Sequence, residues 1–203
     1  MAHIQTLDEL RALYDAPKGR ALTKQLDHLE KHCQHFVSLS PFLILSTSNA
    51  QGMQDASPRG EDPGFVKVLD EHRLAIPDRP GNNRLDTYSN LISSPNVGLI
   101  FLIPGVNETL RVNGVSEIRD DQELIDLFAS QPRKPKTVLV VHVKEAYLHC
   151  AKALMRSNLW REEAKLSRAN LPTMSQMIKD QTQSSEPLES QQEMEARYRD
   201  ILY

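Results

Sequence analysis

Short apolar runs separated by turn-forming residues fill the first half of the chain. The run at residues 41–48 is followed by Asn-Ala-Gln-Gly, and a returning strand is expected from residue 53. Two further runs, at residues 65–69 and 73–76, are separated by three polar residues. Runs of this length bounded by Gly, Asn and Asp are typical of β-hairpins. Consecutive hairpins predict an α+β fold with an antiparallel sheet closing into a barrel, rather than a parallel βαβ sheet.

A helical pattern interrupts the strands in the middle of the chain. Apolar residues at positions 85, 88, 91 and 92 recur at spacings of three and four, which predicts a helix that begins near Asn83 and ends before Pro95. The apolar run at residues 97–103, its return at 108–114 and the segment 115–118 predict further strands. The alternating segment at residues 137–148 predicts the last strand of the barrel.

Helical patterns flank these strands at both ends. A capping box formed by Thr6 and Glu9 predicts a helix at residues 7–15, and the pattern at 21–36 predicts a second helix. Further helices are expected at residues 122–129, 172–178 and 193–202. We therefore predict N-terminal helices packing on the barrel at residues 1–40, the barrel at 41–160, and a helical tail at 161–203.

Composition narrows the possible partners and the compartment. The chain has 203 residues and a formal net charge of −3, so it carries no general attraction for nucleic acid or anionic membranes. Its two cysteines suit a reducing compartment, and no apolar run approaches the roughly 20 residues that span a bilayer. We expect a soluble cytoplasmic protein that binds neither nucleic acid nor membrane.

Two clusters of polar residues are candidates for chemistry. His28, His32 and His35 lie at helical spacing beside Cys33, but structural zinc sites bring ligands together from separate elements, so we predict no metal. The turn before the central helix places Asn83 and Arg84 at a helix start, where unpaired N–H groups favour a phosphate. The alternative is a solvated loop. The basic loop at residues 132–136 is interpreted as a solvated connection or a contact for an anionic partner.

Five segments between residues 41 and 160 carry a family resemblance. FLILST, ASPRG, LAIPDRPGNNRLDTYSNLISSPNVGLIFLIP, ETLRVNG and HCAKALMRSNLW occur in this order. Together they resemble the FMN-binding split-barrel family related to pyridoxamine 5′-phosphate oxidase, and most closely its bacterial flavoprotein branch. The resemblance implies a split β-barrel with flanking helices, an FMN cofactor and a homodimer with flavin sites between the two chains.

The resemblance also implies which residues hold the cofactor. Ser57 and Arg59 fall on one phosphate-binding element and Arg84 on the other, while His149 and Lys152 match a segment that reaches the flavin of the neighbouring subunit. Arg111 or Lys152 could stabilise charge on the reduced ring. The implied cofactor-binding residues are Ser57, Pro58, Arg59, Ile76, Pro77, Asp78, Asn82, Asn83, Arg84, Thr109, Arg111, His149 and Lys152.

The reaction itself does not follow from the resemblance. The chain ends in ARYRDILY, where the oxidase has a basic, histidine-containing motif, and Arg59 is followed by GEDPGF, where the family has a lysine. We therefore expect an FMN-dependent oxidoreductase acting on an unknown small molecule, with no assigned catalytic side chain and NAD(P)H as a candidate electron donor. The alternatives are a non-catalytic split barrel that binds flavin, or haem through His142 or His149, and a structural dimer with an empty cleft.

Overall fold

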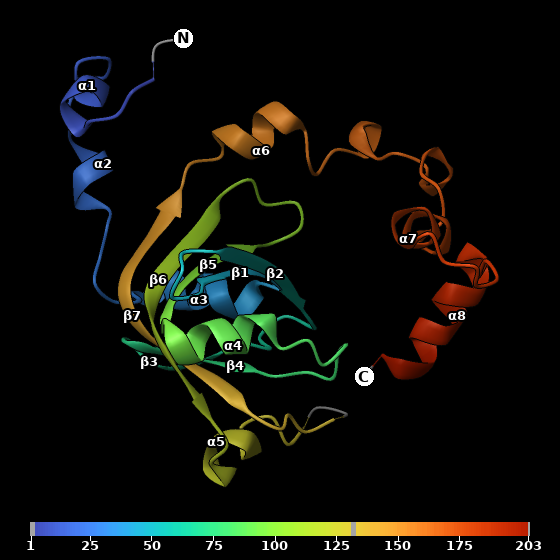
Figure 1. Ribbon diagram of the computed structural model, residues 1–203. Coiled ribbons are helices and arrows are strands. Elements are labelled where there is room, and N and C mark those ends of the chain that lie inside the picture. The colour runs from blue at the N-terminus through green and yellow to red at the C-terminus, as the bar shows by residue number, and fades with distance from the viewer. Residues whose placement is uncertain (1–2, 131–132, 203) are drawn as a thin grey trace.

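The computed structural model describes residues 3–130 and 133–202 and is built on one antiparallel sheet (Figure 1). Its seven strands lie in the order β2-β1-β5-β6-β7-β4-β3. Their bounds are β1 (Phe42–Ser48), β2 (Gln54–Gly60), β3 (Lys67–Asp70), β4 (Arg73–Pro77), β5 (Asn96–Leu102), β6 (Thr109–Arg119) and β7 (Val138–His149). The edge strands β2 and β3 do not pair with each other in the described chain, so the sheet curls into a split barrel instead of closing. The antiparallel split barrel with flanking helices is thereby confirmed.

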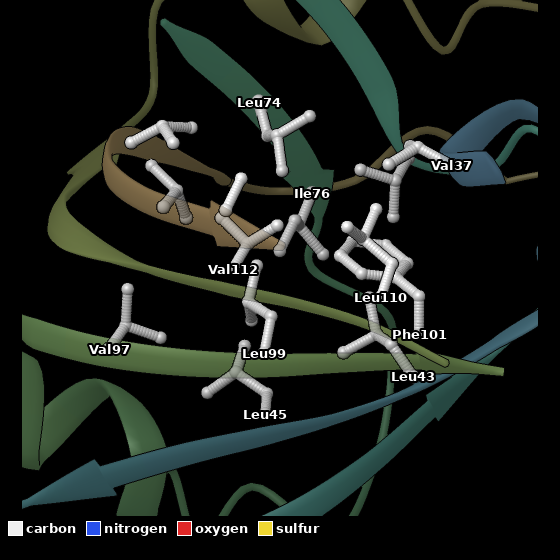
Figure 2. Close-up of a cluster of buried hydrophobic side chains, with 14 of the residues drawn as sticks. Val37, Leu43, Leu45, Leu74, Ile76, Val97, Leu99, Phe101, Leu110 and Val112 are labelled. Carbon is white, nitrogen blue, oxygen red and sulfur yellow. The ribbon is translucent and has the colours of Figure 1, made fainter. Parts of the chain in front are cut away.

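Alternation along strands such as β1 separates a buried face from an outer face, whereas β4 and the start of β7 are buried on both faces. On β1, Leu43 and Leu45 are buried, whereas Phe42 and Ile44 are each 37% exposed. Period-two alternation places every second side chain on the same face of a sheet. The inner face forms the core shown in Figure 2, whose labelled residues are Val37, Leu43, Leu45, Leu74, Ile76, Val97, Leu99, Phe101, Leu110 and Val112.

Helices cover the inner side of the sheet and extend from both ends of the chain. Helix α3 (Lys31–Leu39) buries Cys33 and Val37, and α4 (Asp86–Ser93) buries Thr87 and Leu91. The remaining helices are α1 (Leu7–Arg11), α2 (Arg20–Thr23), α5 (Gln122–Asp126), α6 (Lys152–Ser157), η1 (Glu162–Ala164), η2 (Arg168–Asn170), α7 (Met174–Thr182) and α8 (Gln191–Ile201). Within the described residues, no helix is both long and apolar enough to cross a membrane.

The prediction of one helix over residues 21–36 is wrong. Strand β4 pairs with β7 only as far as His142, which leaves the edge of β7 free near Ala146. Leu26 occupies this edge: its N–H donates to Ala146 O over 3.0 Å and its carbonyl accepts from Ala146 N over 2.8 Å. Glu30 then begins α3 by accepting bonds from the backbone N–H groups of His32 and Cys33. Pairing with the sheet edge therefore replaces the central turns of the predicted helix.

The last forty residues leave the barrel altogether (Figure 1). Helices α6, α7 and α8 follow one another in a wide arc that stands off the sheet. None of the side chains described after His149 is buried. The predicted helices at residues 172–178 and 193–202 are confirmed as α7 and α8, with bounds shifted by about one to four residues.

A bulge in the longest strand pair depends on the absence of a side chain at Gly114. The β6–β7 register shifts between Asn113 and Gly114, and a Cβ atom on Gly114 would lie 2.3 Å from His142 O. No rotamer change relieves a clash with backbone. Gly81, in contrast, has only Arg79 O at 4.0 Å.

We expect Gly114→Ala to lower the free energy of unfolding by about 1–3 kcal/mol, the usual cost of overpacking. Urea denaturation followed by circular dichroism measures the change. Gly81→Ala serves as the control and should alter stability by less than about 0.5 kcal/mol. Equal effects of the two substitutions would contradict the role of the bulge.

Candidate functional site

A cavity of about 980 Å³ opens where the barrel is split. Its volume lies at the upper end of the range for small-molecule and cofactor sites, about 300–1,000 Å³. Strand β2, the end of β4, the loop at residues 78–85, the start of α4 and residues 133–136 surround it. The lining residues are Ser57, Pro58, Arg59, Gly60, Glu61, Phe65, Pro77, Asp78, Arg79, Pro80, Gly81, Asn82, Asn83, Arg84, Leu85, Asp86, Thr87, Tyr88, Arg133, Lys134 and Lys136.

Hydroxyl groups and a guanidinium group converge on one wall of this cavity. Alternation on β2 turns Ser57 and Arg59 toward α4, where Thr87 lies. The Ser57 and Thr87 hydroxyl oxygens are 3.2 Å apart, and Arg59 Nη2 donates to Thr87 Oγ1 over 3.3 Å. Thr87 in turn donates to Asp55 Oδ2 over 2.7 Å. These bonds hold β2 and α4 together and fix the positions of three polar side chains.

Arg59 differs from Arg79 and Arg84 in its partners, because those two arginines pair with carboxylates. Its hydrogen bonds go to neutral acceptors, Pro58 O at 2.9 Å and Thr87 Oγ1. Across the described chain, no carboxylate lies within ion-pair distance of Arg59, although its side chain is part of a half-buried strand. A guanidinium group in this setting favours an anion, because its N–H donors are not paired with a carboxylate, although it interacts at longer range with the charge of Asp78.

The loop before α4 does not form the helix start that the sequence predicts. Asn83 and Leu85 both have a φ of 58°, in the left-handed region, so helical geometry begins only at Asp86. Asn82 Oδ1 accepts from Arg84 N over 3.0 Å, and Arg84 Nε pairs with Asp86 at 2.8 Å. The Arg84 side chain is 72% exposed. Asn83 and Arg84 therefore lie in a loop at the cavity rim, two to three residues before the helix.

Arg79 supports this loop from within. Its guanidinium group donates to both carboxylate oxygens of Glu61, over 2.6 and 2.7 Å, and to the carbonyl of Arg133. The two paired side chains are only 8% and 13% exposed. Paired hydrogen bonds between a guanidinium and a carboxylate constrain direction as well as distance. Arg79 thus ties the loop at 78–85 to β2 and to the basic loop, of which residues 133–136 are described.

The cavity carries a positive charge in a chain that is negative overall. Six basic side chains and three acidic ones line it, although the formal net charge of the chain is −3. Burial raises the pKa of Asp78 above its ordinary value, against the opposing effects of the Tyr88 hydroxyl and Arg59. Burial, followed by the charge on Asp78, also raises the pKa of Tyr88. The cavity therefore favours an anionic ligand and disfavours further negative charge on its own side chains.

The cofactor-binding residues inferred from the resemblance fall into two groups: those that line or adjoin the cavity, and those that lie away from it. Eight of them line the cavity: Ser57, Pro58, Arg59, Pro77, Asp78, Asn82, Asn83 and Arg84. Ile76 lies behind the cavity wall with its side chain in the core, 2% exposed. Thr109, Arg111, His149 and Lys152 do not line the cavity of this chain.

Three residues of this second group form a polar ladder on β6 and β7. Thr109 pairs with His149, and Arg111 pairs with Tyr147. Arg111 lies 4.1 Å from the Tyr147 ring centroid and forms an ion pair with Glu145. Burial, with nearby Arg111, lowers the pKa of His149. Lys152 follows at the start of α6 and is exposed.

Sequence reasoning missed several contributors to both groups. Thr87 and Tyr88 lie inside a helix and carry no motif, so only the packing of α4 on β2 identifies them. Lys24 lies 4.8 Å from the Tyr147 ring centroid because the segment after α2 pairs with β7. The histidines near Cys33 do not gather: among the described residues, no group of three His, Cys, Asp or Glu side chains is placed to hold a metal ion.

Comparison with known proteins agrees with this architecture. Residues 29–150 match the family model of pyridoxamine 5′-phosphate oxidase. The split barrel defines the class, and this match, which spans more than half of the chain, shows that the protein belongs to the pyridoxamine 5′-phosphate oxidase family. Comparison with curated protein sequences yields no match.

Solved structures resemble the barrel at low sequence identity. A variant of HupZ from Group A Streptococcus is 13% identical, with a TM-score of 0.51 over 60% of this chain and 99% of that chain. A candidate pyridoxamine 5′-phosphate oxidase from Lactobacillus delbrueckii is 20% identical, with a TM-score of 0.50 over 61% of this chain and 98% of that chain. At these identities the likeness concerns the fold. Both proteins are covered almost completely, so the part of this chain outside the alignment is additional to them.

The raised pKa of Asp78 gives stability a specific pH dependence. Because the folded state favours the protonated form, the favourable contribution is present below the ordinary aspartate pKa of about 3.9 and is lost as the pH rises through the folded-state value. We expect Asp78→Asn to raise the free energy of unfolding at pH 7, and this gain should disappear toward pH 3. Denaturant titrations across this range test it, with the exposed Asp62→Asn as control. A gain that is independent of pH would count against the burial effect.

Proposed function

We propose that the cavity binds FMN, with the phosphate held at the wall formed by Ser57, Arg59 and Thr87. The observation that carries this proposal is the half-buried Arg59 guanidinium, which has neutral hydrogen-bond partners beside two hydroxyl groups. A phosphate monoester carries about −1.5 to −2 charges and accepts hydrogen bonds through three oxygens. The Arg59 guanidinium therefore matches a phosphate in charge and in its N–H donors, and the Thr87 and Ser57 hydroxyls, which donate to Asp55 before binding, must turn toward the phosphate.

The rim of the cavity supplies further donors for the same group. Arg84 and Asn82 lie on the loop that Arg79 and Glu61 hold in place, so they reach the cavity from a supported backbone. Arg84 exchanges its surface ion pair with Asp86 for a contact with the phosphate. The Arg79–Glu61 pair remains intact and keeps the loop fixed during binding.

The isoalloxazine ring is proposed to lie beyond the phosphate, against the end of β4. Pro77 and Asp78 line the cavity there, and Ile76 stiffens the strand from the core side. Bound FMN would supply hydride and electron transfer, while the chain binds and orients it and tunes its potential. The proposed activity is an FMN-dependent oxidoreductase acting on a small molecule, with NAD(P)H as a candidate donor.

A second chain is proposed to complete the site. Phe42, Ile44 and Ile100 are each 37% exposed on the outer face of the sheet, and Ile44 and Ile100 are cross-strand partners. Ile100 is also the partner of Arg111, so this apolar surface adjoins the polar ladder. An apolar centre beside polar and aromatic residues is typical of protein interfaces. In a homodimer formed through this face, Arg111, His149 and Lys152 approach the flavin of the other chain.

Purified protein distinguishes this proposal from its alternatives. Yellow protein with flavin absorbance supports FMN binding, a Soret band supports a haem protein, and colourless protein that takes up neither supports an empty cleft. Anaerobic mixing with NAD(P)H, with bleaching that an acceptor reverses, separates an oxidoreductase from a flavin carrier.

Removal of the Arg59 guanidinium should weaken FMN binding because its hydrogen bonds to the phosphate are lost. We expect Arg59→Ala to raise the FMN dissociation constant by about 10- to 150-fold, corresponding to about 1.5–3 kcal/mol for hydrogen bonds to a charged group. Riboflavin, which lacks the phosphate, should bind both proteins equally. Fluorescence quenching measures both ligands. Arg73→Ala, an exposed arginine outside the cavity, is the matched control. An equal loss of riboflavin affinity in Arg59→Ala would assign Arg59 a structural role instead.

Loss of the Lys152 charge should lower the reduction potential of the bound flavin. Reduction places negative charge on the N1–C2=O edge of the ring, and a nearby cation stabilises that state. We expect Lys152→Gln to shift the midpoint potential to a more negative value in a spectroelectrochemical titration. Lys18→Gln, an exposed lysine in the N-terminal segment, should leave it unchanged. An unchanged potential in Lys152→Gln would place this residue away from the ring.

A further inference from the structure

Residues 161–202 are here called the C-terminal arm. Within the described chain, the arm is attached to the barrel only at its N-terminal end. The Trp160 indole N–H, immediately before the arm, donates to Val106 O over 2.8 Å at the β5–β6 hairpin. Beyond this point, the hydrogen bonds and ion pairs found within the described residues stay inside the arm or reach back only to Asn158. The arm is therefore held at one end and stands off the sheet for the rest of its length (Figure 1).

The arm nevertheless has a defined internal structure. Glu189 N donates to Ser175 Oγ over 2.9 Å, and Lys179 Nζ donates to Glu186 O over 3.2 Å. Arg197 forms paired hydrogen bonds with Glu189 over 2.9 and 2.8 Å. These contacts join α7 to α8 as a helical hairpin. The two helices have 9 and 11 residues, lengths at which isolated helices are only marginally stable in water.

Apolar side chains on the arm have no cover from the rest of the chain. Leu166 is 81% exposed, Leu171 is 60% exposed, Leu188 is 51% exposed and Ile178 is 49% exposed. Ile178 lies on α7 and the three leucines lie in the segments that connect the short helices. A single exposed leucine needs no explanation, but several along one segment do. The stability of the arm therefore requires a surface that this chain does not supply.

The charge of the arm indicates which surface it meets. Residues 186–195 contain Glu186, Glu189, Glu193 and Glu195 and no lysine or arginine. The cavity rim at residues 133–136 carries Arg133, Lys134 and Lys136. Within the described part of the chain, no ion pair joins these two segments. Glu189 pairs with Arg197 and Lys134 pairs with Asp126. Among the described residues, Glu186, Glu193 and Glu195 on the arm and Arg133 and Lys136 on the rim form no ion pair, so their opposite charges are available for a contact between chains.

We propose that the arm of each chain packs across a second copy of this chain, with its acidic segment against the basic rim of that copy's cavity. The inference rests on the homodimer of the proposed function. An isologous interface repeats every contact. A single two-fold axis therefore relates both the contact between the outer faces of the two sheets and the contacts of the two arms. The arm then becomes a clasp that restricts exit of the cavity's ligand.

Engineered disulfides test where the arm lies. In a Cys150→Ser background, one tagged chain carries Glu186→Cys and a differently tagged chain carries Lys136→Cys. After subunit exchange and mild oxidation, we expect a covalent product that contains both tags. Arg73→Cys replaces Lys136→Cys in the control, because Arg73 lies on β4 away from the rim, and it should give no product. A cross-link confined to a single chain carrying both substitutions, or none in any combination, overturns the proposal.

Truncation after Trp160 provides an independent measurement. Sedimentation equilibrium should show a dimer dissociation constant raised by about tenfold or more, and FMN should dissociate faster. If the truncated chain forms the dimer as tightly and releases FMN as slowly as the full chain, the clasp is wrong while the flavin proposal stands. A full-length chain that dimerises and cross-links but takes up no FMN overturns the flavin proposal and leaves the clasp intact.

Discussion

A single sheet must bury one face without closing, and this constraint determines the rest of the structure. Strands β6 and β7 are the longest, and they join the half-barrel of β2, β1 and β5 to that of β4 and β3. Gly114 allows the bulge by which this pair changes register. Because the edge strand β2 does not meet β3, the gap between the half-barrels leaves space for the cavity. The split in the barrel and the location of the site are therefore one structural feature.

The cavity combines side chains that are already paired with side chains that are not. Arg79 and Glu61 satisfy each other almost completely out of solvent, so their contribution is to fix the loop at 78–85. Arg59 has neutral partners and keeps its charge for a ligand. A loop fixed before binding loses little conformational entropy when the ligand arrives. Pro58 and Gly60 flank Arg59, whereas Asp78 and Pro80 flank Arg79, and neither pattern predicts which arginine pairs with Glu61.

The sequence predicts the strands and most helices because these depend on local patterns, whereas the residues of the cavity wall are implied by the family resemblance. Alternation sets the inner face of β1, and the capping box begins α1 at Leu7. The errors come from interactions between distant segments. Nothing in the sequence of residues 21–36 indicates that the edge of β7 is free at Ala146. Pairing with this edge nevertheless makes the centre of the segment extended. The spacing of apolar residues predicts a helix that begins near Asn83. The left-handed conformations of Asn83 and Leu85, in the loop that Arg79 supports, delay the start of α4 to Asp86.

The two groups of implied site residues lie on surfaces that belong to different sides of the sheet. Ser57 and Arg59 face α4 and the cavity, whereas Arg111 and Tyr147 lie on the outer face next to Ile100. Within one chain, alternation holds these groups on opposite sides of their strands, and no rotamer change brings them together. The outer face also carries exposed Phe42 and Ile44, which remain in water unless another surface covers them. If both groups serve one ligand, that ligand must lie between two chains, and the apolar outer face is the surface available to bring those chains together.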